Sequence, residues 1–229
     1  MPASLVIAGF VAHGESVTTP LLVFIGPSGS GKSSVVRSLV ERGIIRVHPT
    51  WTTRPRRDDE TAGSPEHRFV SEKQFLALHR EGFFLDAVQM FGLPHWYGLP
   101  GIDTADTDGV DAGVVDAVML RAPLIPRLRE HFPDPVIYQI EASAGVLEER
   151  LGERHYGSRE LRARLADNDA EKLAGRKIAH RRFSSDRALD TVADDVERAV
   201  REDYTRRLSN TPNSPLRTTR RRERPWSMS

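Results

Sequence analysis

The amino-acid sequence predicts an α/β fold in which a parallel sheet is wrapped by helices. Three apolar runs, at residues 21–25, 114–120 and 136–140, have the continuous hydrophobic character of strands that are buried on both faces. Sequence with helical periodicity follows each run. Because alternating strands and helices are typical of parallel sheets, these observations favour one α/β domain in the 229-residue chain.

The first apolar run leads directly into a segment that fits the pattern GxxxxGK[ST]. Its glycines allow backbone N–H groups to turn inward around a triphosphate, and a helix that begins at Lys32 adds its positive N-terminal end. The pattern therefore predicts an ATP site in which Lys32 reaches the β and γ phosphates and Ser33 offers its hydroxyl to Mg²⁺. The alternative is a plain glycine and serine turn between a strand and a helix. The expected nucleotide-binding residues are Gly26, Pro27, Ser28, Gly29, Ser30, Gly31, Lys32, Ser33 and Ser34.

Local signals define the remaining elements. The helix that begins at Lys32 ends before Gly43, and a capping box formed by Ser71 and Gln74 starts the next helix. Serines at positions 143 and 158 are expected to cap two further helices. The other expected elements are loop and short strand at 47–65, a helix at about 72–81, a strand at 83–88, a loop at 94–98, and a last amphipathic helix through Val192, Val196, Ala199 and Val200.

Composition excludes several classes of site and partner. A formal net charge of +1 lacks the basic excess of a nucleic-acid-binding protein, so no specific nucleic acid partner is expected. The chain has no cysteine, which excludes disulfides, thiolate metal sites and a thiol nucleophile and favours a cytoplasmic enzyme. No apolar run is long enough to cross a bilayer, so neither a membrane partner nor a signal peptide is expected.

Composition also divides the chain into three parts. Residues 1–20 form an N-terminal extension, and residues 21–205 form the α/β domain. Residues 206–229 are rich in serine, threonine, proline and arginine, with Glu223 as the only acid. We expect this segment to be a disordered basic tail, because it has too few apolar residues to dock on a core.

A second group of phosphate-binding side chains follows the first helix. The segment TTRPRR at residues 52–57 places several guanidinium groups on one loop, where they could hold the phosphate of an acceptor. The alternative is a solvated charged loop in which these arginines pair with Asp58, Asp59 and Glu60.

Together these segments resemble the guanylate kinase family over about residues 20–200. The resemblance implies the P-loop NTPase fold of the nucleoside monophosphate kinases, with an acceptor-binding insertion at about 48–100 and a lid at about 154–170. It also implies ATP and Mg²⁺ as donor and cofactor. The matching segments are GPSGSGKSS at 26–34, TTRPRR at 52–57 with Glu60 and Gly63 after it, FVSEKQF at 69–75, GFF at 82–84, YG at 97–98, and LEERLGER at 147–154 with Arg164-Leu165.

The resemblance assigns roles to individual side chains. In the family, the arginine of TTR and the arginine three places on clamp the acceptor phosphate, which implies this role for Arg54 and Arg57. Lid arginines that stabilise the transferring phosphoryl group correspond to Arg150, Arg154 and Arg164. Because the first two are four residues apart, a solvated helix face is the alternative. The other acceptor-binding residues that the resemblance implies are Thr50, His67, Asp86 and Tyr97.

The departures from the family lie around the base of the acceptor. The base-reading glutamate is replaced by Asp86, a serine or threonine by Leu99, a tyrosine by His67, and two strand aspartates by Met119 and Arg121. Guanine recognition needs acceptors for its N–H groups, so these replacements predict poor base discrimination. A relative that phosphorylates ribose 1,5-bisphosphate also lacks the base reader. The short segments shared with that relative lie at 62–67, 92–98 and 121–124.

The favoured function is transfer of the γ-phosphoryl group of ATP to a small phosphorylated acceptor, with GMP first. Lys32, Arg57 and the lid arginines are expected to act through charge and position. Ribose 1,5-bisphosphate, a sugar phosphate, is the alternative acceptor. A non-catalytic binding module is disfavoured by the intact Gly31-Lys32-Ser33, and a regulatory P-loop ATPase by the arginines of 52–57. We expect a monomer or a homodimer.

Overall fold

The structure is a computed structural model that describes residues 20–57, 60, 63–90, 92–102, 114–154 and 158–210. Within these residues, no helix is both long and apolar enough to span a bilayer. The N-terminal extension lies almost wholly outside the described residues.

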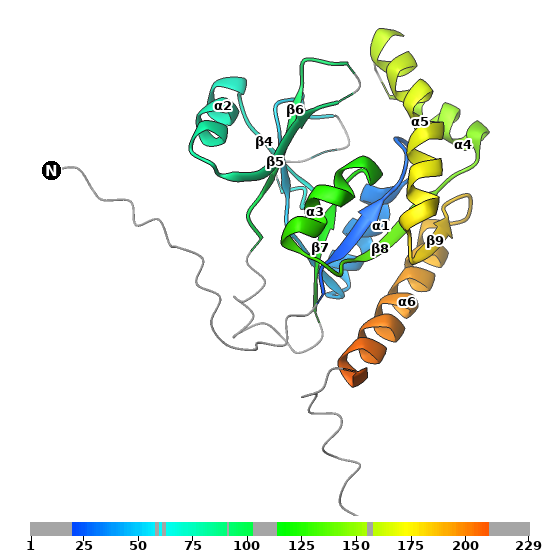
Figure 1. Ribbon diagram of the computed structural model, residues 1–229. Coiled ribbons are helices and arrows are strands. Elements are labelled where there is room, and N and C mark those ends of the chain that lie inside the picture. Colours follow the sequence, from blue (N-terminus) through cyan, green and yellow to red (C-terminus); the bar gives the residue numbers. More distant parts are fainter. Residues whose placement is uncertain are drawn as a thin grey trace, which may run out of the picture.

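A five-stranded parallel sheet forms the centre of the molecule (Figure 1). Its strand order is β2-β7-β1-β8-β9, and every neighbouring pair in it runs parallel. The three apolar runs all form strands of this sheet, which confirms the predicted fold class. The bounds of the strands are β1 Leu22–Ile25, β2 Ile45–Val47, β7 Val115–Met119, β8 Val136–Glu141 and β9 Arg181–Ser184.

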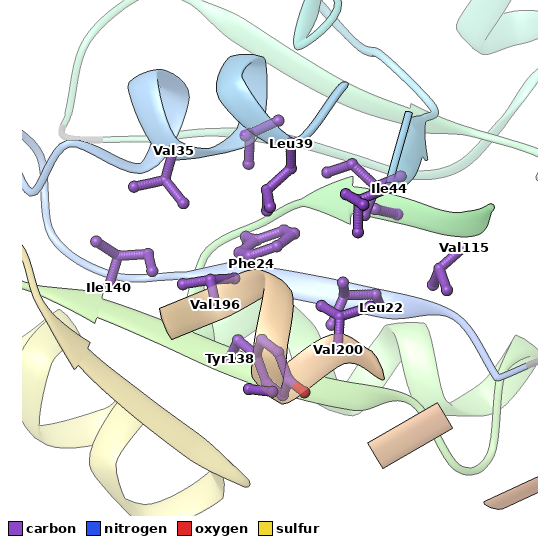
Figure 2. Close-up of a cluster of buried hydrophobic side chains, with 14 of the residues drawn as sticks. Leu22, Phe24, Val35, Leu39, Ile44, Val115, Tyr138, Ile140, Val196 and Val200 are labelled. Atoms are coloured by element: carbon purple, nitrogen blue, oxygen red, sulfur yellow. The ribbon is translucent and has the colours of Figure 1, made fainter. Parts of the chain in front are cut away.

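Alternate residues of β1 point to opposite faces of the sheet and bury two cores. Leu22 and Phe24 join the core under α1 (Lys32–Glu41) and α6 (Leu189–Asn210), as Figure 2 shows. Leu21, Val23 and Ile25 join the opposite core, which is covered by the 3₁₀ helix η1, α3 and α5. The bounds of these three helices are η1 Ala122–Leu124, α3 Ile125–His131 and α5 Ser158–Ile178.

A second sheet of four strands lies beside the first (Figure 1) and carries the acceptor-binding segments expected from the sequence. Its order is β4-β3-β6-β5. The helix α2 (Glu72–Arg80) begins with the predicted capping box and packs its one buried side chain, Phe75, on Phe84, with ring centroids 4.5 Å apart. The strands are β3 Thr50–Thr52, β4 His67–Phe69, β5 Phe84–Gln89 and β6 Trp96–Pro100.

The loop predicted at residues 94–98 is wrong, because Trp96, Tyr97 and Gly98 belong to β6. This strand pairs antiparallel with β3 on one side and with β5 on the other. Gly98 is needed for packing: a Cβ there would lie 2.6 Å from the Phe84 ring and 2.9 Å from Phe75. The proline and glycine that suggest a loop therefore reflect contacts made by residues distant in sequence.

The predicted helix starts are placed correctly, but their capping differs. Ser143 is the N-cap of α4 (Ala144–Gly152) without a capping hydrogen bond from its side chain. Its backbone N–H instead donates to Asp186, at 2.9 Å. Ser158 is the first residue of α5, and residues 155–157 before it lie outside the described residues.

The C-terminal boundary is also corrected. Helix α6 continues to Asn210, so residues 206–210, assigned to the disordered tail, are helical. Within this stretch Arg207 forms an ion pair with Asp134, in the loop between α3 and β8. Residues 211–229 lie outside the described residues, and their disorder stays a prediction.

Candidate active site

The loop between β1 and α1 has a backbone that only glycine tolerates at two critical points. Gly26 has φ of 140°, and a Cβ there would lie 2.1 Å from the carbonyl oxygen of Ile140. Gly31 has φ of 79° and is the N-cap of α1, with no capping side chain. The first N–H groups of a helix have no intrahelical partner, so this end of α1 offers donors and a positive dipole to an anion.

Lys32 is half-buried in this loop. Its ammonium donates to the carbonyl oxygens of Gly26 and Pro27, the latter at 2.9 Å. Burial lowers the pKa of Lys32 from 10.5 to about 7, and nearby arginines lower it further, while Glu171 opposes the shift. A bound anion at this position would remove the electrostatic cost of the buried ammonium.

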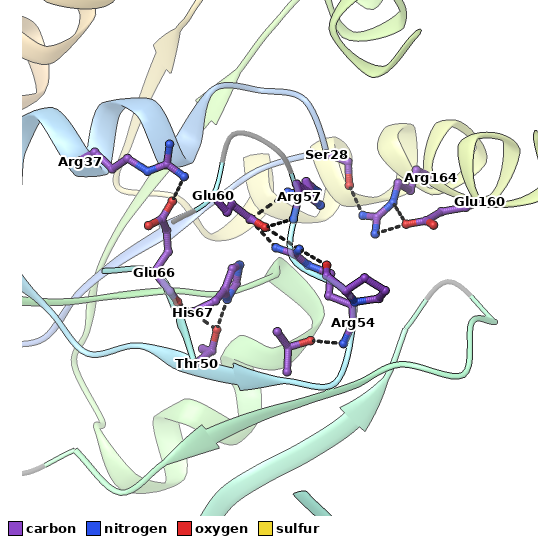
Figure 3. A network of polar contacts seen from close by, with 12 residues as sticks. Ser28, Arg37, Thr50, Arg54, Arg57, Glu60, Glu66, His67, Glu160 and Arg164 are labelled. Carbon is purple, nitrogen blue, oxygen red and sulfur yellow. Dashed lines mark hydrogen bonds and ion pairs between the residues drawn. The ribbon is translucent and has the colours of Figure 1, made fainter. Parts of the chain in front are cut away.

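Helix α5 presents a polar stripe to the loop, made of residues 164, 168 and 171, which lie on one helix face. The Asn168 amide accepts from the N–H of Ser28 at 2.9 Å and donates to its carbonyl oxygen at 3.2 Å. Arg164 is 2% exposed, pairs with Glu160 and donates to the hydroxyl of Ser28 at 3.4 Å (Figure 3). The stripe therefore fixes the first half of the loop against the lid helix.

The end of β7 carries a positive charge where the family has an acid. Arg121 pairs with Glu171 at 2.9 Å and with Asp167, both on α5. Glu171 is 1% exposed and also accepts from the backbone N–H of Ala122 at 2.8 Å. The carboxylates of Asp167 and Glu171 on α5 thus balance the positive charge of Arg121.

Two of the three lid arginines reach the cleft beside Lys32. Arg154 and Arg164 line it. Arg150 instead donates to the hydroxyl of Ser185 at 3.0 Å and to the carbonyl oxygen of Gly29 at 3.4 Å. These contacts argue against the solvated helix face and give Arg150 a bond to the loop backbone.

The two acceptor arginines converge on one buried carboxylate (Figure 3). Arg54 is 5% exposed and binds both oxygens of Glu60, at 2.7 and 2.5 Å. Arg57 donates its backbone N–H to the same carboxylate at 2.9 Å and its guanidinium at 3.4 Å. Burial would raise the pKa of Glu60, but the bonds to Arg54 outweigh this and lower it to about 2. The pairing with Glu60 that the alternative expected is therefore present, but Arg54 and Glu60 are buried rather than solvated, and the ionised Glu60 holds both guanidinium groups in place. Asp58 and Asp59 lie outside the described residues.

Thr50 and His67 form a second pair in the same region. The Thr50 hydroxyl and His67 Nδ1 are 2.8 Å apart. Burial, reinforced by the charge of Arg54, lowers the pKa of His67 to about 3, so the imidazole is neutral near pH 7. The preceding residue, Glu66, forms an ion pair with Arg37 of α1 at 2.5 Å and so ties the second sheet to the first (Figure 3).

One cleft brings most of these groups together. Asp86 and Tyr97 line its other end, together with Leu99 and Met119, two of the positions that depart from the family. Gly26, Pro27 and Arg150 do not line it. The sequence-predicted residues that do are Ser28, Gly29, Ser30, Gly31, Lys32, Ser33, Ser34, Thr50, Arg54, Arg57, His67, Asp86, Tyr97, Arg154 and Arg164.

Sequence reasoning missed three residues that shape this site: Asn168, Glu171 and Arg127, which forms an ion pair with Asp86 at 2.5 Å. The first two share the helical spacing of Arg164, so a polar stripe on an otherwise exposed helix could have indicated them. The partner of Arg127 lies 41 residues away, and nothing local indicates it.

The comparisons with known proteins agree with this geometry. No family model matches the chain. It is 36% identical over 138 residues to the guanylate kinase of Legionella pneumophila (strain Paris), covering 58% of this chain and 63% of that relative, so the alignment spans just under two thirds of the relative's length. It is 30% identical over 183 residues to the guanylate kinase of Thermosynechococcus vestitus, covering 79% of this chain and 88% of that relative.

A solved structure of the guanylate kinase from Anaplasma phagocytophilum matches the fold with a TM-score of 0.58. The alignment is 20% identical and covers 82% of this chain and 87% of that chain. This likeness shows the fold alone.

We predict that Asn168→Ala destabilises the phosphate loop. The backbone N–H and carbonyl of Ser28 lose their partners, so the free energy of unfolding should fall by about 1–3 kcal/mol and ATP should bind more weakly. Denaturant unfolding and calorimetric ATP titration measure the two effects. Asp169→Ala, an exposed neighbour on the same helix, is the matched control and should change neither. Equal behaviour of the two variants would contradict the role of Asn168.

We also predict that binding of ATP takes up a proton. With a pKa of about 7, Lys32 is mostly neutral at pH 8 in the free protein, whereas a bound triphosphate favours the ammonium. Titrations in buffers of different ionisation enthalpy should therefore show uptake of close to one proton at pH 8 and little at pH 6, where Lys32 is already charged. Equal uptake at the two pH values would show that Lys32 is not the group that titrates.

Proposed function

Because the chain belongs to the guanylate kinase family, we propose that it is an ATP- and Mg²⁺-dependent kinase whose acceptor is GMP. One observation supports this proposal more than any other. A single cleft is lined both by Lys32 of the phosphate loop and by Arg54 and Arg57, which are paired with Glu60. A donor triphosphate and an acceptor phosphate would be brought together between these cationic groups.

The donor would lie along the phosphate loop. The N-terminus of α1 and Lys32 would hold its phosphates, and a second hollow on the far side of Gly29 and Gly31, lined by Arg150 and Ser185, offers room for its base and ribose. Arg150 would then act by fixing the loop rather than by touching the transferred group, since its guanidinium is bonded to Ser185 and Gly29.

The residues present fit a Mg²⁺ ion that is held jointly with the nucleotide. Ser33 lines the cleft in the first turn of α1. Among the described residues, no group of three or more His, Asp or Glu side chains could hold a metal alone, and Mg²⁺ commonly takes one or two protein ligands with phosphate oxygens and water. When bound, the ion would neutralise charge on the triphosphate.

The transfer step would need charge stabilisation rather than a strong base. Arg154 and Arg164 line the cleft beside Lys32, placed for the charge that develops on the transferring phosphoryl group. Arg54 and Arg57, oriented by Glu60, would hold the acceptor phosphate in line, because a guanidinium has five N–H donors and its bond to one carboxylate leaves others for phosphate.

The closest competing acceptor is ribose 1,5-bisphosphate. Leu99 and Met119 are apolar and line the cleft, so they give a nucleotide base few polar partners. For this reason ribose 1,5-bisphosphate is tested as an alternative acceptor. A binding module without turnover is disfavoured, because Gly31, Lys32 and Ser33 keep a complete phosphate loop around a buried ammonium.

A coupled ADP-release assay against GMP, the other nucleoside monophosphates and ribose 1,5-bisphosphate tests the proposal. We expect ADP release that depends on GMP and is lost in Lys32→Ala. GMP-independent ADP release would favour an ATPase, and release only with the sugar phosphate would change the acceptor. Binding of ATP and GMP without ADP release would favour the binding module.

Arg54→Ala and Arg57→Ala are predicted to raise the KM for the acceptor by at least about tenfold, the size of one lost charge-assisted hydrogen bond, while the KM for ATP changes little. Arg68→Ala, an exposed arginine of β4, is the matched control. Steady-state kinetics with each substrate varied in turn measure both constants. An equal rise in both KM values would show that these arginines do not hold the acceptor.

A further inference from the structure

Asp86 of β5 carries a buried carboxylate oxygen that no described residue satisfies. The side chain is 9% exposed and lines the cleft. Its Oδ1 accepts from Arg127, whereas Oδ2 is buried without a hydrogen-bond partner among the described residues. Leaving such an oxygen unpaired is costly, so it is a natural docking point for an N–H or O–H donor of a ligand.

The surroundings of Asp86 are mostly apolar. Among the described residues that line the cleft, Asp86 supplies the only carboxylate. Two of the basic side chains that line the cleft are Arg121, which forms ion pairs with Asp167 and Glu171, and His131 of α3. A ligand donor at this end of the cleft therefore has one carboxylate to bind. The apolar lining consists of Leu85, Val88, Met90, Leu99, Met119, Leu120, Leu124 and Leu128.

Arg127 binds this carboxylate from a helix that packs on the other sheet. It lies on α3, over the five-stranded sheet, and its guanidinium is 2.5 Å from Asp86 Oδ1 while its side chain is 65% exposed. The ion pair thus covers the rim of the acceptor cleft. It also takes one acceptor position of Oδ1, so a pair of adjacent N–H donors would have to share that oxygen with the guanidinium.

We propose that Arg127 is a specificity-determining residue that weakens one of the two hydrogen bonds that Asp86 could accept from the base of the acceptor. Guanine presents two adjacent donors, the ring N–H and the 2-amino group, whereas hypoxanthine presents only the ring N–H. With Arg127 already bound to Oδ1, the second donor of guanine gains less from Asp86 than it would gain from an oxygen without this partner, so GMP is favoured over IMP only weakly. This inference rests on the proposed function, in which the base of the acceptor nucleotide lies at Asp86.

The test is the ratio of kcat/KM for GMP to that for IMP in the full chain. Arg127→Ala frees Oδ1 for the second donor of guanine and should raise this ratio at least about tenfold over the wild-type value, the size of one charge-assisted hydrogen bond. Asp86→Asn in the Arg127→Ala background should return the ratio to the wild-type value. Because Arg127 is largely exposed, its replacement should not prevent folding.

Two controls separate this effect from a general loss of charge. Arg127→Lys keeps a cation on Asp86, and Arg129→Ala removes an exposed arginine from the same helix outside the cleft; both should keep the wild-type ratio. An unchanged ratio in Arg127→Ala, with both nucleotides still phosphorylated, overturns the inference alone. If the wild-type protein phosphorylates neither nucleotide, the proposed function fails and the inference falls with it.

Discussion

The structure depends on holding a concentration of positive charge around one cleft. Desolvation lowers the pKa of the half-buried Lys32 to about 7, and Arg54 and Arg164 are almost fully buried. Carboxylates behind the arginines, such as Glu60 and Glu160, compensate them from outside the cleft. Removing one partner of such a buried pair is strongly destabilising, so these acids are as necessary to the site as the cations they orient.

Helix α5 connects this charge arrangement to the fold. Its most buried side chains are the polar Arg164, Asn168 and Glu171, while Ala174 and Ile178 near its end pack against the apolar core. Asn168 and Arg164 bind Ser28 of the phosphate loop, and Glu171 binds Arg121, which follows β7. Since the contacts of α5 with the phosphate loop are hydrogen bonds of Asn168 and Arg164, the position of this part of the helix should respond to an anion that binds in the loop.

The sequence predicts well those structural features that depend on residues close together along the chain. The buried strands, the phosphate loop and the capping box at Ser71 all depend on residues within a few positions, and the structure contains each of them. The strand through Trp96 and Tyr97 was missed, because its pairing partners lie on β3 and β5. The charge pairs of Arg121 and Arg127 span more than 40 residues and depend on how helices pack over strands, which no local pattern encodes.

The two ends of the acceptor cleft are built by different physical means. At the phosphate end, charge is concentrated and oriented by Glu60, which supplies affinity for any compound with a phosphate group. At the base end, Leu99 and Met119 supply apolar contact, and Asp86 alone offers a directed acceptor, half of it occupied by Arg127. Apolar contact discriminates weakly between related ligands, whereas hydrogen-bonding groups discriminate strongly. In the proposed reaction, selectivity would therefore depend on a single carboxylate, while phosphoryl transfer would depend on a network of cations in which Arg54 and Arg164 are buried.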